Sequence, residues 1–271
     1  MTSKRNLHVA KWLVGSALVM VGSSAMADWS FASGTTGTPS GTTITAKATA
    51  LSTNGSGSTF IAATATSWTG GIGVRSTAEA DTTPEHSTDN VGSTDAVMLS
   101  FSSSVVLTGI TSGWTWKDGA AAGSAAAASD SDVSVLRYIG TATTAAAVAS
   151  AALGKTVATL TAAGGGWELV SQIANLVTGA NTSTGDTTLG SSWWLVSAYN
   201  SGYTSVATTT SSAANLLNNG NDYFKLLAVA GVATPKSSVP EPGSLALVGA
   251  GLLGFLASRR KAKGKTIGLA A

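Results

Sequence analysis

The residues able to do chemistry are few, and the densest group of them lies between Asp81 and Asp95. Calcium prefers carboxylate, amide and carbonyl oxygens, and a turn that carries Asp89, Asn90 and Asp95 supplies ligands of this kind. We therefore predict a calcium site on these three residues. The alternative is that Asp89 and Asn90 cap a turn through their side chains. The sequence has no EF-hand spacing that would favour calcium over this alternative.

Little in the sequence supports catalysis. His8 and His86 are its two histidines, cysteine is absent, and no G-x-S-x-G motif occurs. We expect His86 to be structural, with a ring nitrogen hydrogen-bonded to a neighbouring turn. Asp130 and Asp132 would point the same way on a strand, which suits glycoside hydrolysis, but we interpret them as the start of that strand. We therefore predict that the protein is not an enzyme.

Tryptophan is more abundant than a small core needs. Tryptophans on the strands of an all-β domain usually bury one face in the core, and we expect this of most of them. The alternative is that exposed indoles stack on sugar rings. The tryptophans concerned are Trp68, Trp114, Trp116, Trp167, Trp193 and Trp194.

These residues must be positioned by strands. Residues 28–73 alternate small polar residues with Ile, Val, Phe and Trp, and Asn54-Gly55 marks a turn, so we predict antiparallel hairpins here. A short helix is expected from Ala145 to Leu153 on alanine propensity, and residues 118–129 form an Ala- and Gly-rich insertion. Further strands are predicted, and a serine-rich turn joins Val97–Phe101 to Val105–Trp114. These strands are Val97–Phe101, Val105–Trp114, Val133–Ile139, Trp167–Ile173, Ser192–Tyr199 and Asp222–Gly231. Many short strands separated by turns predict an all-β fold, a β-sandwich or jelly roll.

The N-terminus has the three parts of a secretory signal peptide. Lys4, Arg5 and Lys11 form a basic region, residues 12–21 an apolar helix, and Ala25-Met26-Ala27 a small-residue cleavage box. We predict that the Sec translocon exports the chain and that signal peptidase cuts after Ala27. Residues 1–27 are then a signal peptide.

The C-terminus carries a second processing segment. Val239, Pro240, Glu241 and Pro242 cannot form a helix and favour an extended backbone. The uncharged run after them is shorter than the roughly 20 residues that span a bilayer comfortably, so we expect a marginal, transient transmembrane helix in the inner membrane. The basic stop that follows obeys the positive-inside rule and begins with Arg259, Arg260 and Lys261.

These C-terminal residues resemble the PEP-CTERM sorting signal of Gram-negative bacteria, which combines a Pro-Glu-Pro tripeptide, a short apolar helix and a basic end. The resemblance implies recognition by an exosortase, a membrane-embedded cysteine transpeptidase, with cleavage at or near Pro240 to Pro242. The alternative is an ordinary anchor whose prolines form a linker. We assign residues 239–271 to this sorting and anchor segment.

Removal of both ends changes the charge of the chain. The formal net charge is +2 from 15 basic and 13 acidic residues. Three of the basic residues lie in the signal and five lie beyond Ser258, whereas Glu241 is the one acid lost, so the body 28–238 keeps 7 basic and 12 acidic residues and a net charge of −5. Without a basic face, nucleic-acid binding is not expected.

The body also resembles the exosortase-dependent surface protein family, which is secreted, β-rich and without known catalysis. The segments that carry this similarity include Pro84–Phe101, Asp130–Tyr138, Trp193–Tyr199 and Asn221–Leu226. The order of these segments is similar to that in galactose-binding-like jelly rolls. This similarity is at the level of fold and does not assign a ligand.

Taken together, we expect one β-sandwich domain over residues 28–238, in a protein displayed at the cell surface or in the extracellular matrix. Its expected role is structural, in an exopolysaccharide or biofilm layer. The alternative is a lectin-like, carbohydrate-binding module that depends on calcium. We expect no other cofactor.

Overall fold

The computed structural model describes residues 26–55, 58–77, 86–116, 131–185, 188–204, 209–210, 217 and 220–234. The predicted signal helix and the predicted transmembrane helix both lie outside these ranges, and so does Asp130. Among the residues described, no helix combines the length and the apolar character needed to cross a membrane.

Strands dominate the described part of the chain, and the prediction of an all-β fold is confirmed. The jelly-roll, galactose-binding-like topology stays a prediction. The strands are β1 (Met26–Ser30), β2 (Thr36–Ser40), β3 (Ala46–Thr53), β4 (Phe60–Trp68), β5 (Gly71–Arg75), β6 (Thr88–Asp89), β7 (Asp95–Thr115), β8 (Val133–Tyr138), β9 (Trp167–Ile173), β10 (Asn181–Ser183), β11 (Gly190–Ala198), β12 (Thr209–Thr210) and β13 (Tyr223–Ala233). Two short helices, α1 (Ala145–Ala152) and α2 (Val157–Thr161), follow β8.

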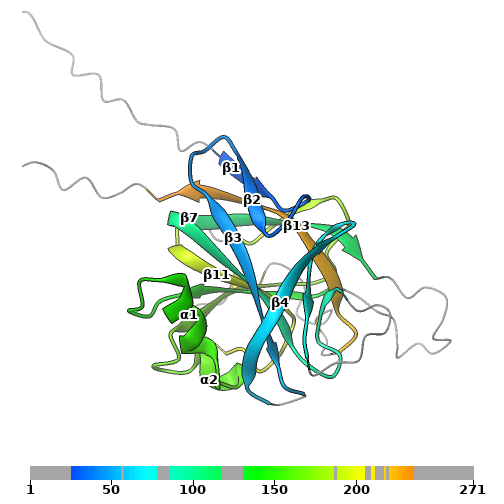
Figure 1. Ribbon diagram of the computed structural model, residues 1–271, viewed down its shortest axis with the longest axis vertical. Helices are drawn as coiled ribbons and strands as arrows, with labels where there is room; N and C mark the ends of the chain where they lie inside the picture. Colours follow the sequence, from blue (N-terminus) through cyan, green and yellow to red (C-terminus); the bar gives the residue numbers. More distant parts are fainter. Residues whose placement is uncertain are drawn as a thin grey trace, which may run out of the picture.

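The strands form one sheet that folds back on itself (Figure 1). Its order is β1-β2-β3-β4-β5-β13-β7-β11-β8-β9-β12. Because β1 also pairs with β13, a closed ring is formed by β1, β2, β3, β4, β5 and β13. Every strand pair is antiparallel except β9 with β12. Because β13 pairs with β1, β5, β6 and β7, this strand lies at the centre of the sheet.

Strand β7 is a single long element where we predicted two strands and a turn. Its first part pairs with β3 up to Phe101, and its second part pairs with β13 from Val105 onward. The serine-rich run between them does not turn, because its backbone stays paired on both sides: Ser102 donates to the Thr45 carbonyl at 3.0 Å, and Ser104 accepts from Thr234 at 3.1 Å. The two-strand prediction was therefore wrong, and the serines form a bulge where β7 changes partners.

The sheet separates two buried apolar layers. Along β7, Val97 and Leu99 pack into one hydrophobic cluster, whereas Ala96 and Met98 pack into the other. Successive strand residues point to opposite faces, so a strand that is covered on both faces must be apolar without alternation. This explains the unbroken apolar run from residue 96 to residue 99.

The helices cover one of these layers. Both lie on the same side of the sheet, and Val148 of α1 and Leu160 of α2 are fully buried in the second cluster (Figure 1). Thr144 caps the first helix, and Thr156 caps the second through a reciprocal hydrogen bond with Thr159. The helix predicted from residue 145 is thereby confirmed.

Candidate functional site

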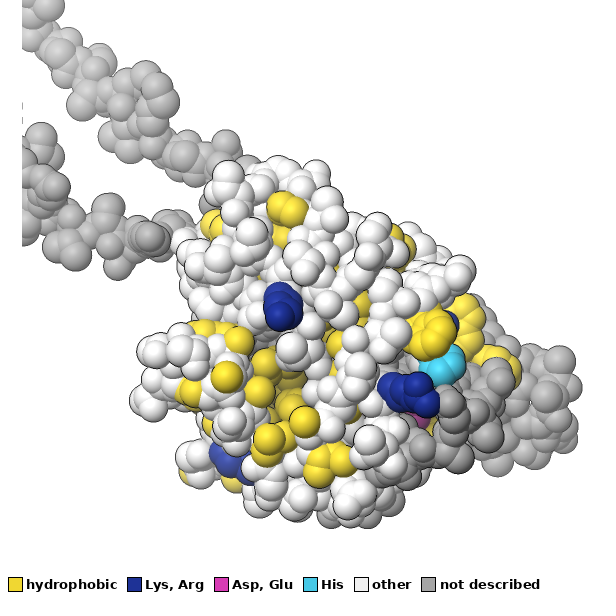
Figure 2. Space-filling model, in the orientation of Figure 1, with side chains coloured by type: hydrophobic (Ala, Val, Ile, Leu, Met, Phe, Trp, Pro, Cys, Tyr) yellow, Lys and Arg dark blue, Asp and Glu magenta, His cyan; other side chains and the backbone are white. Residues whose placement is uncertain are grey.

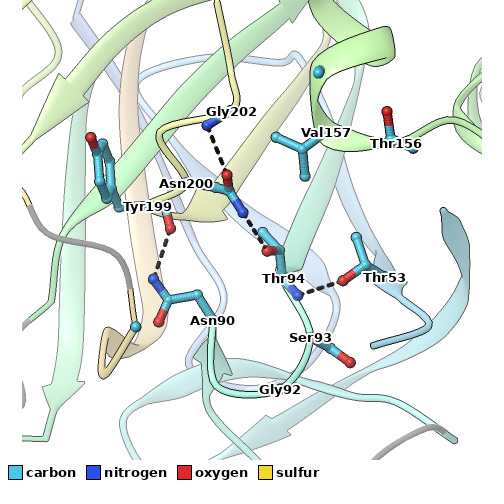
Figure 3. Close-up of a pocket in the computed structure, with 12 residues that line it drawn as sticks. Thr53, Asn90, Gly92, Ser93, Thr94, Thr156, Val157, Tyr199, Asn200 and Gly202 are labelled. Atoms are coloured by element: carbon cyan, nitrogen blue, oxygen red, sulfur yellow. Dashed lines mark hydrogen bonds between the residues drawn. The ribbon is translucent and has the colours of Figure 1, made fainter. Parts of the chain in front are cut away.

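A polar cleft lies where the loop after β6 meets the loop after β11 and the start of α2 (Figure 3). It has a volume of about 570 Å³. Hydroxyl and amide side chains form most of its wall, and no charged side chain is among the lining residues described. The wall consists of Thr53, Asn90, Gly92, Ser93, Thr94, Thr156, Val157, Ala158, Tyr199, Asn200, Gly202 and Gly220.

Hydrogen bonds fix the amides of this cleft in place. The Asn200 amide donates to Thr94 Oγ1 at 2.8 Å and accepts from the Gly202 N–H at 2.8 Å. The Thr94 N–H in turn donates to Thr53 Oγ1 at 2.7 Å. Figure 3 shows this chain of contacts crossing the cleft. Since the partners come from β3, the loop before β7 and the loop after β11, the cleft is held by segments far apart in the sequence.

Asp222, just before β13, anchors the wall from behind. It is fully buried, and its carboxylate accepts hydrogen bonds from the Asn90 amide and from the Asp132 N–H, the latter at 2.7 Å. The Asn90 Oδ1 accepts from the Asp222 N–H at 3.0 Å, and its Nδ2 donates to the Tyr199 carbonyl at 2.7 Å. A buried carboxylate needs such donors to offset its desolvation. The network thus joins the loop after β6 to β13, β8 and β11.

The three residues of the predicted calcium site lie close together in sequence and structure. Asp89 and Asp95 are buried, and the Asp89 N–H donates to Asp95 Oδ2 at 3.5 Å. Asp89 also accepts from the Val91 N–H at 3.1 Å, which is the turn-capping contact of the alternative interpretation. Within the described ranges, no cluster of three or more acidic or histidine side chains is arranged to hold a metal. Calcium binding by Asp89, Asn90 and Asp95 stays a prediction.

Burial favours the neutral form of two tyrosines, Tyr199 in the cleft wall and Tyr203 in the second hydrophobic cluster. Burial raises the pKa of Tyr199, and the charges of Asp132 and Asp222 raise it further. Burial also raises the pKa of Tyr203 well above its usual range; a hydrogen bond with Ser197 opposes this shift, and Asp95 adds to it. Neutral phenols and amides can bind a polyhydroxylated ligand, but they supply no ready nucleophile.

The other acidic residue that we considered for chemistry points inward. Asp132 is fully buried, and its Oδ1 accepts from the Asn175 N–H at 2.7 Å. It immediately precedes β8, so its interpretation as a strand start is confirmed.

A second surface feature is built on aromatic rings. Trp68, at the end of β4, stacks on His86 with ring centroids 4.0 Å apart and an interplanar angle of 19°. The expected hydrogen bond to a turn is not made by His86 Nδ1, which is buried without a partner among the residues described. His86 also has a φ of 85°, in the left-handed region that few non-glycine residues adopt. Stacking on Trp68 accounts for the position of this ring.

More rings follow on the neighbouring strands. Trp114 lies 5.9 Å from Trp116, and Trp116 lies 6.5 Å from Tyr223, measured between ring centroids. Lys225 Nζ sits 4.9 Å from the centre of the Trp114 ring, and burial lowers the pKa of this lysine. We call Trp68, His86, Trp114, Trp116, Tyr223 and Lys225 the aromatic surface cluster. Figure 2 shows apolar, histidine and basic side chains gathered at one edge of the molecule.

The tryptophans therefore divide between core and surface. Trp167 and Trp194 are buried as expected, whereas Trp68 is 37% exposed. Trp193 is half-buried and packs edge-on against Tyr138. Sequence reasoning gave no role to Asn200, Tyr199 or Asp222. Their positions beside predicted strand ends were visible, but the pairing that joins them was not.

The described residues nearest the two predicted processing segments lie on paired strands. Ala27 of the predicted cleavage box is buried in β1 and lies opposite Gly231 of β13, and Met26 lies opposite Val232. Ala25, Val239, Pro240, Glu241 and Pro242 lie outside the described residues, and so does the basic stop formed by Arg259, Arg260 and Lys261. The predicted signal therefore ends, and the sorting segment follows, at one end of the β1–β13 pair. Figure 1 shows β1 beside the C-terminal end of β13.

Comparison with known proteins identifies the C-terminal segment. A family model described as the PEP-CTERM protein-sorting motif matches residues 238–261. No curated protein and no solved structure matches the chain. The matched residues contain the Pro-Glu-Pro tripeptide, the apolar run and the first basic residues. The motif implies a membrane-anchored precursor that an exosortase processes. The chain is therefore an exported protein with a PEP-CTERM sorting motif.

Proposed function

We propose that this protein is a structural component of the cell surface or extracellular matrix in a Gram-negative bacterium. The sorting motif at residues 238–261 carries the proposal. It follows a body built on a single sheet, which is buried on both faces along residues 96–99 of β7. Such a body suits a passive, hydrated layer of exopolysaccharide or biofilm.

In this proposal the Sec translocon exports the precursor and signal peptidase cuts after Ala27. The C-terminal helix then holds the chain in the inner membrane until the exosortase cuts near Pro240. A jelly-roll domain, similar in topology to galactose-binding folds, would be displayed outside. No step of this route requires catalysis by the protein itself.

The sorting step is tested by expressing the chain in strains with and without the exosortase. We expect a smaller mature mass and release from the inner membrane only where the enzyme is present. A variant with Pro240 and Pro242 replaced by alanine should behave in both strains like the uncut chain, and Pro39→Ala in β2 provides a proline control far from the motif. Equal mass and location in both strains would remove the proposal.

A second candidate function is a lectin-like module that depends on calcium. The uncharged, hydroxyl- and amide-lined cleft favours it, because such groups match the hydroxyls of a neutral sugar. Asp89, Asn90 and Asp95 would supply the calcium ligands beside this cleft. Binding on a glycan array that disappears on addition of chelator would support this function, and binding unaffected by chelator would argue against the role of calcium.

A further inference from the structure

The aromatic surface cluster departs from the pattern of the strands that carry it. On the outer face of β4, Thr64 and Thr66 precede Trp68 at alternate positions. A large ring in this row leaves apolar area in water, with 37% of Trp68 exposed. Rings that gather on a surface instead of in the core commonly mark a binding site.

The rings belong to one surface and are held in fixed positions. Gly70 turns the chain two residues after Trp68, and a Cβ there would lie 2.7 Å from Trp114 Cβ. The β4–β5 turn therefore presses directly on β7, which joins the pair Trp68 and His86 to the group around Trp114. Because Trp68 is stacked and Trp114 is covered on one side by Lys225, little side-chain freedom remains to be lost on binding.

Among the described residues of this cluster there is one cation, although the body of the chain is acidic. Lys225 lies within the cluster. The described carboxylates of Asp89, Asp95, Asp132 and Asp222 are buried. Elsewhere in the described ranges, Glu168 pairs with Arg137 at 2.6 Å, and exposed Asp28 lies on β1. A cation beside stacked rings is complementary to an anion that carries flat, partly apolar rings of its own.

The cluster and the sorting segment lie at opposite ends of β13, and this determines the side of the molecule on which a ligand would bind. Tyr223 and Lys225 begin β13, and Ala233 ends it, just before the sorting segment. The eleven residues of the strand span ten steps of about 3.3 Å, so its two ends lie roughly 33 Å apart. A chain tethered through its C-terminal segment would therefore present the rings away from the membrane, toward extracellular polymer.

We propose that the aromatic surface cluster binds a strand of acidic polysaccharide. Sugar rings pack against Trp68 and the Trp114–Trp116 pair, and a uronic acid carboxylate pairs with Lys225. This inference rests on the proposed function, since it names the matrix component that the exported protein holds.

Titration of the purified full chain in detergent tests the proposal, with polygalacturonate, dextran of matched length and single-stranded oligo-dT as probes. We expect polygalacturonate to bind most tightly, and its affinity to fall as salt is raised. Trp68→Ala should weaken binding about tenfold or more, as loss of a stacking aromatic does. Lys225→Gln should weaken binding and flatten its dependence on salt.

Two matched variants control for nonspecific effects. Ile139→Ala removes another exposed apolar side chain, and Lys47→Gln removes an exposed lysine on β3; both should bind as the unaltered chain does. Thermal unfolding verifies that each variant is folded. Absence of polygalacturonate binding, equal binding of dextran, preference for oligo-dT, or unaltered binding by folded Trp68→Ala and Lys225→Gln would each overturn the proposal. Since no exosortase takes part, failure here is distinct from failure of the sorting experiment.

Discussion

The two ends of β13 differ in what their aromatic residues do. Near its C-terminal end, Trp29 of β1 is fully buried, donates to the Ile44 carbonyl at 2.6 Å and packs edge-on against Phe101. At its N-terminal end, Trp68 and its neighbours form a partly exposed surface. Tryptophan therefore packs in the core near the C-terminal end of β13, which we call the tethered end because the sorting motif follows it. It lies partly exposed near the N-terminal end, which we call the free end. The difference follows from which sheet face each indole occupies.

Among the substitutions that test this contrast, Trp29→Ala has the largest expected effect on stability. Truncation of a fully buried tryptophan leaves a cavity and an unpaired Ile44 carbonyl, so we expect a loss of about 3–5 kcal/mol in unfolding free energy. Chemical denaturation measures it. A loss below about 1 kcal/mol would mean that the tethered end does not depend on this indole.

Asp222→Ala tests whether the buried hydrogen-bond network near the free end of β13 stabilises the fold. The substitution leaves the Asp132 N–H and the Asn90 amide without their carboxylate partner. We expect a loss of about 2–4 kcal/mol, measured by denaturation. Combined with Asn90→Ala, the loss should be less than additive, because both residues act in one network. Asp28→Ala, at an exposed carboxylate, should change stability by no more than about 0.5 kcal/mol.

The pH dependence of stability tests the burial of Tyr203. Its pKa is raised in the folded protein, so the unfolded chain ionises first, near pH 10. This contribution to stability is fully present below about pH 10 and is lost as the pH rises further, at up to about 1.4 kcal/mol per pH unit for this one group.

Tyr203→Phe should flatten that alkaline loss. At neutral pH it should cost about 1 kcal/mol, through the lost hydrogen bond with Ser197. Unfolding free energies measured between pH 8 and pH 11 distinguish the two effects. An unchanged slope in the variant would show that Tyr203 does not couple folding to protonation.

Apart from the exposed control Asp28→Ala, the smallest expected effect on stability is that of Trp68→Ala. The side chain is already 37% exposed, and its ring stacks on His86 at the surface. We expect a loss of about 1 kcal/mol or less. A loss as large as that of Trp29→Ala would make this indole a core residue and would abolish the contrast between the two ends.

Much of the fold was predictable from local patterns. Alternation in residues 42–68 predicted a hairpin around Asn54-Gly55, and β3 and β4 flank that turn. The serine-rich run after Phe101 was misinterpreted because serines are common in turns, whereas here neighbouring strands on both sides hold its backbone extended.

The candidate site was less predictable than the fold. Asp89 and Asn90 stood out as an acidic turn, but Asn90 bonds to Asp222, 132 residues further along the chain. Nor could composition separate exposed Trp68 from buried Trp194, since both occur in similar strand contexts. The pairing of distant strands decides these contacts, and a single sequence does not encode it in any local period. The sorting segment was predictable because a peptidase recognises it as a linear peptide.

The central place of β13 has a mechanical consequence. The C-terminal tail follows β13, so a pull on the tail would act along this strand. The hydrogen bonds of β13 to β1 and β7 lie across that direction. If the far end of the molecule is gripped at the same time, these bonds are loaded together, in shear, instead of being peeled open one after another. Loading these bonds together requires more force than peeling them apart, so β13 is placed to resist a pull applied at its C-terminal end.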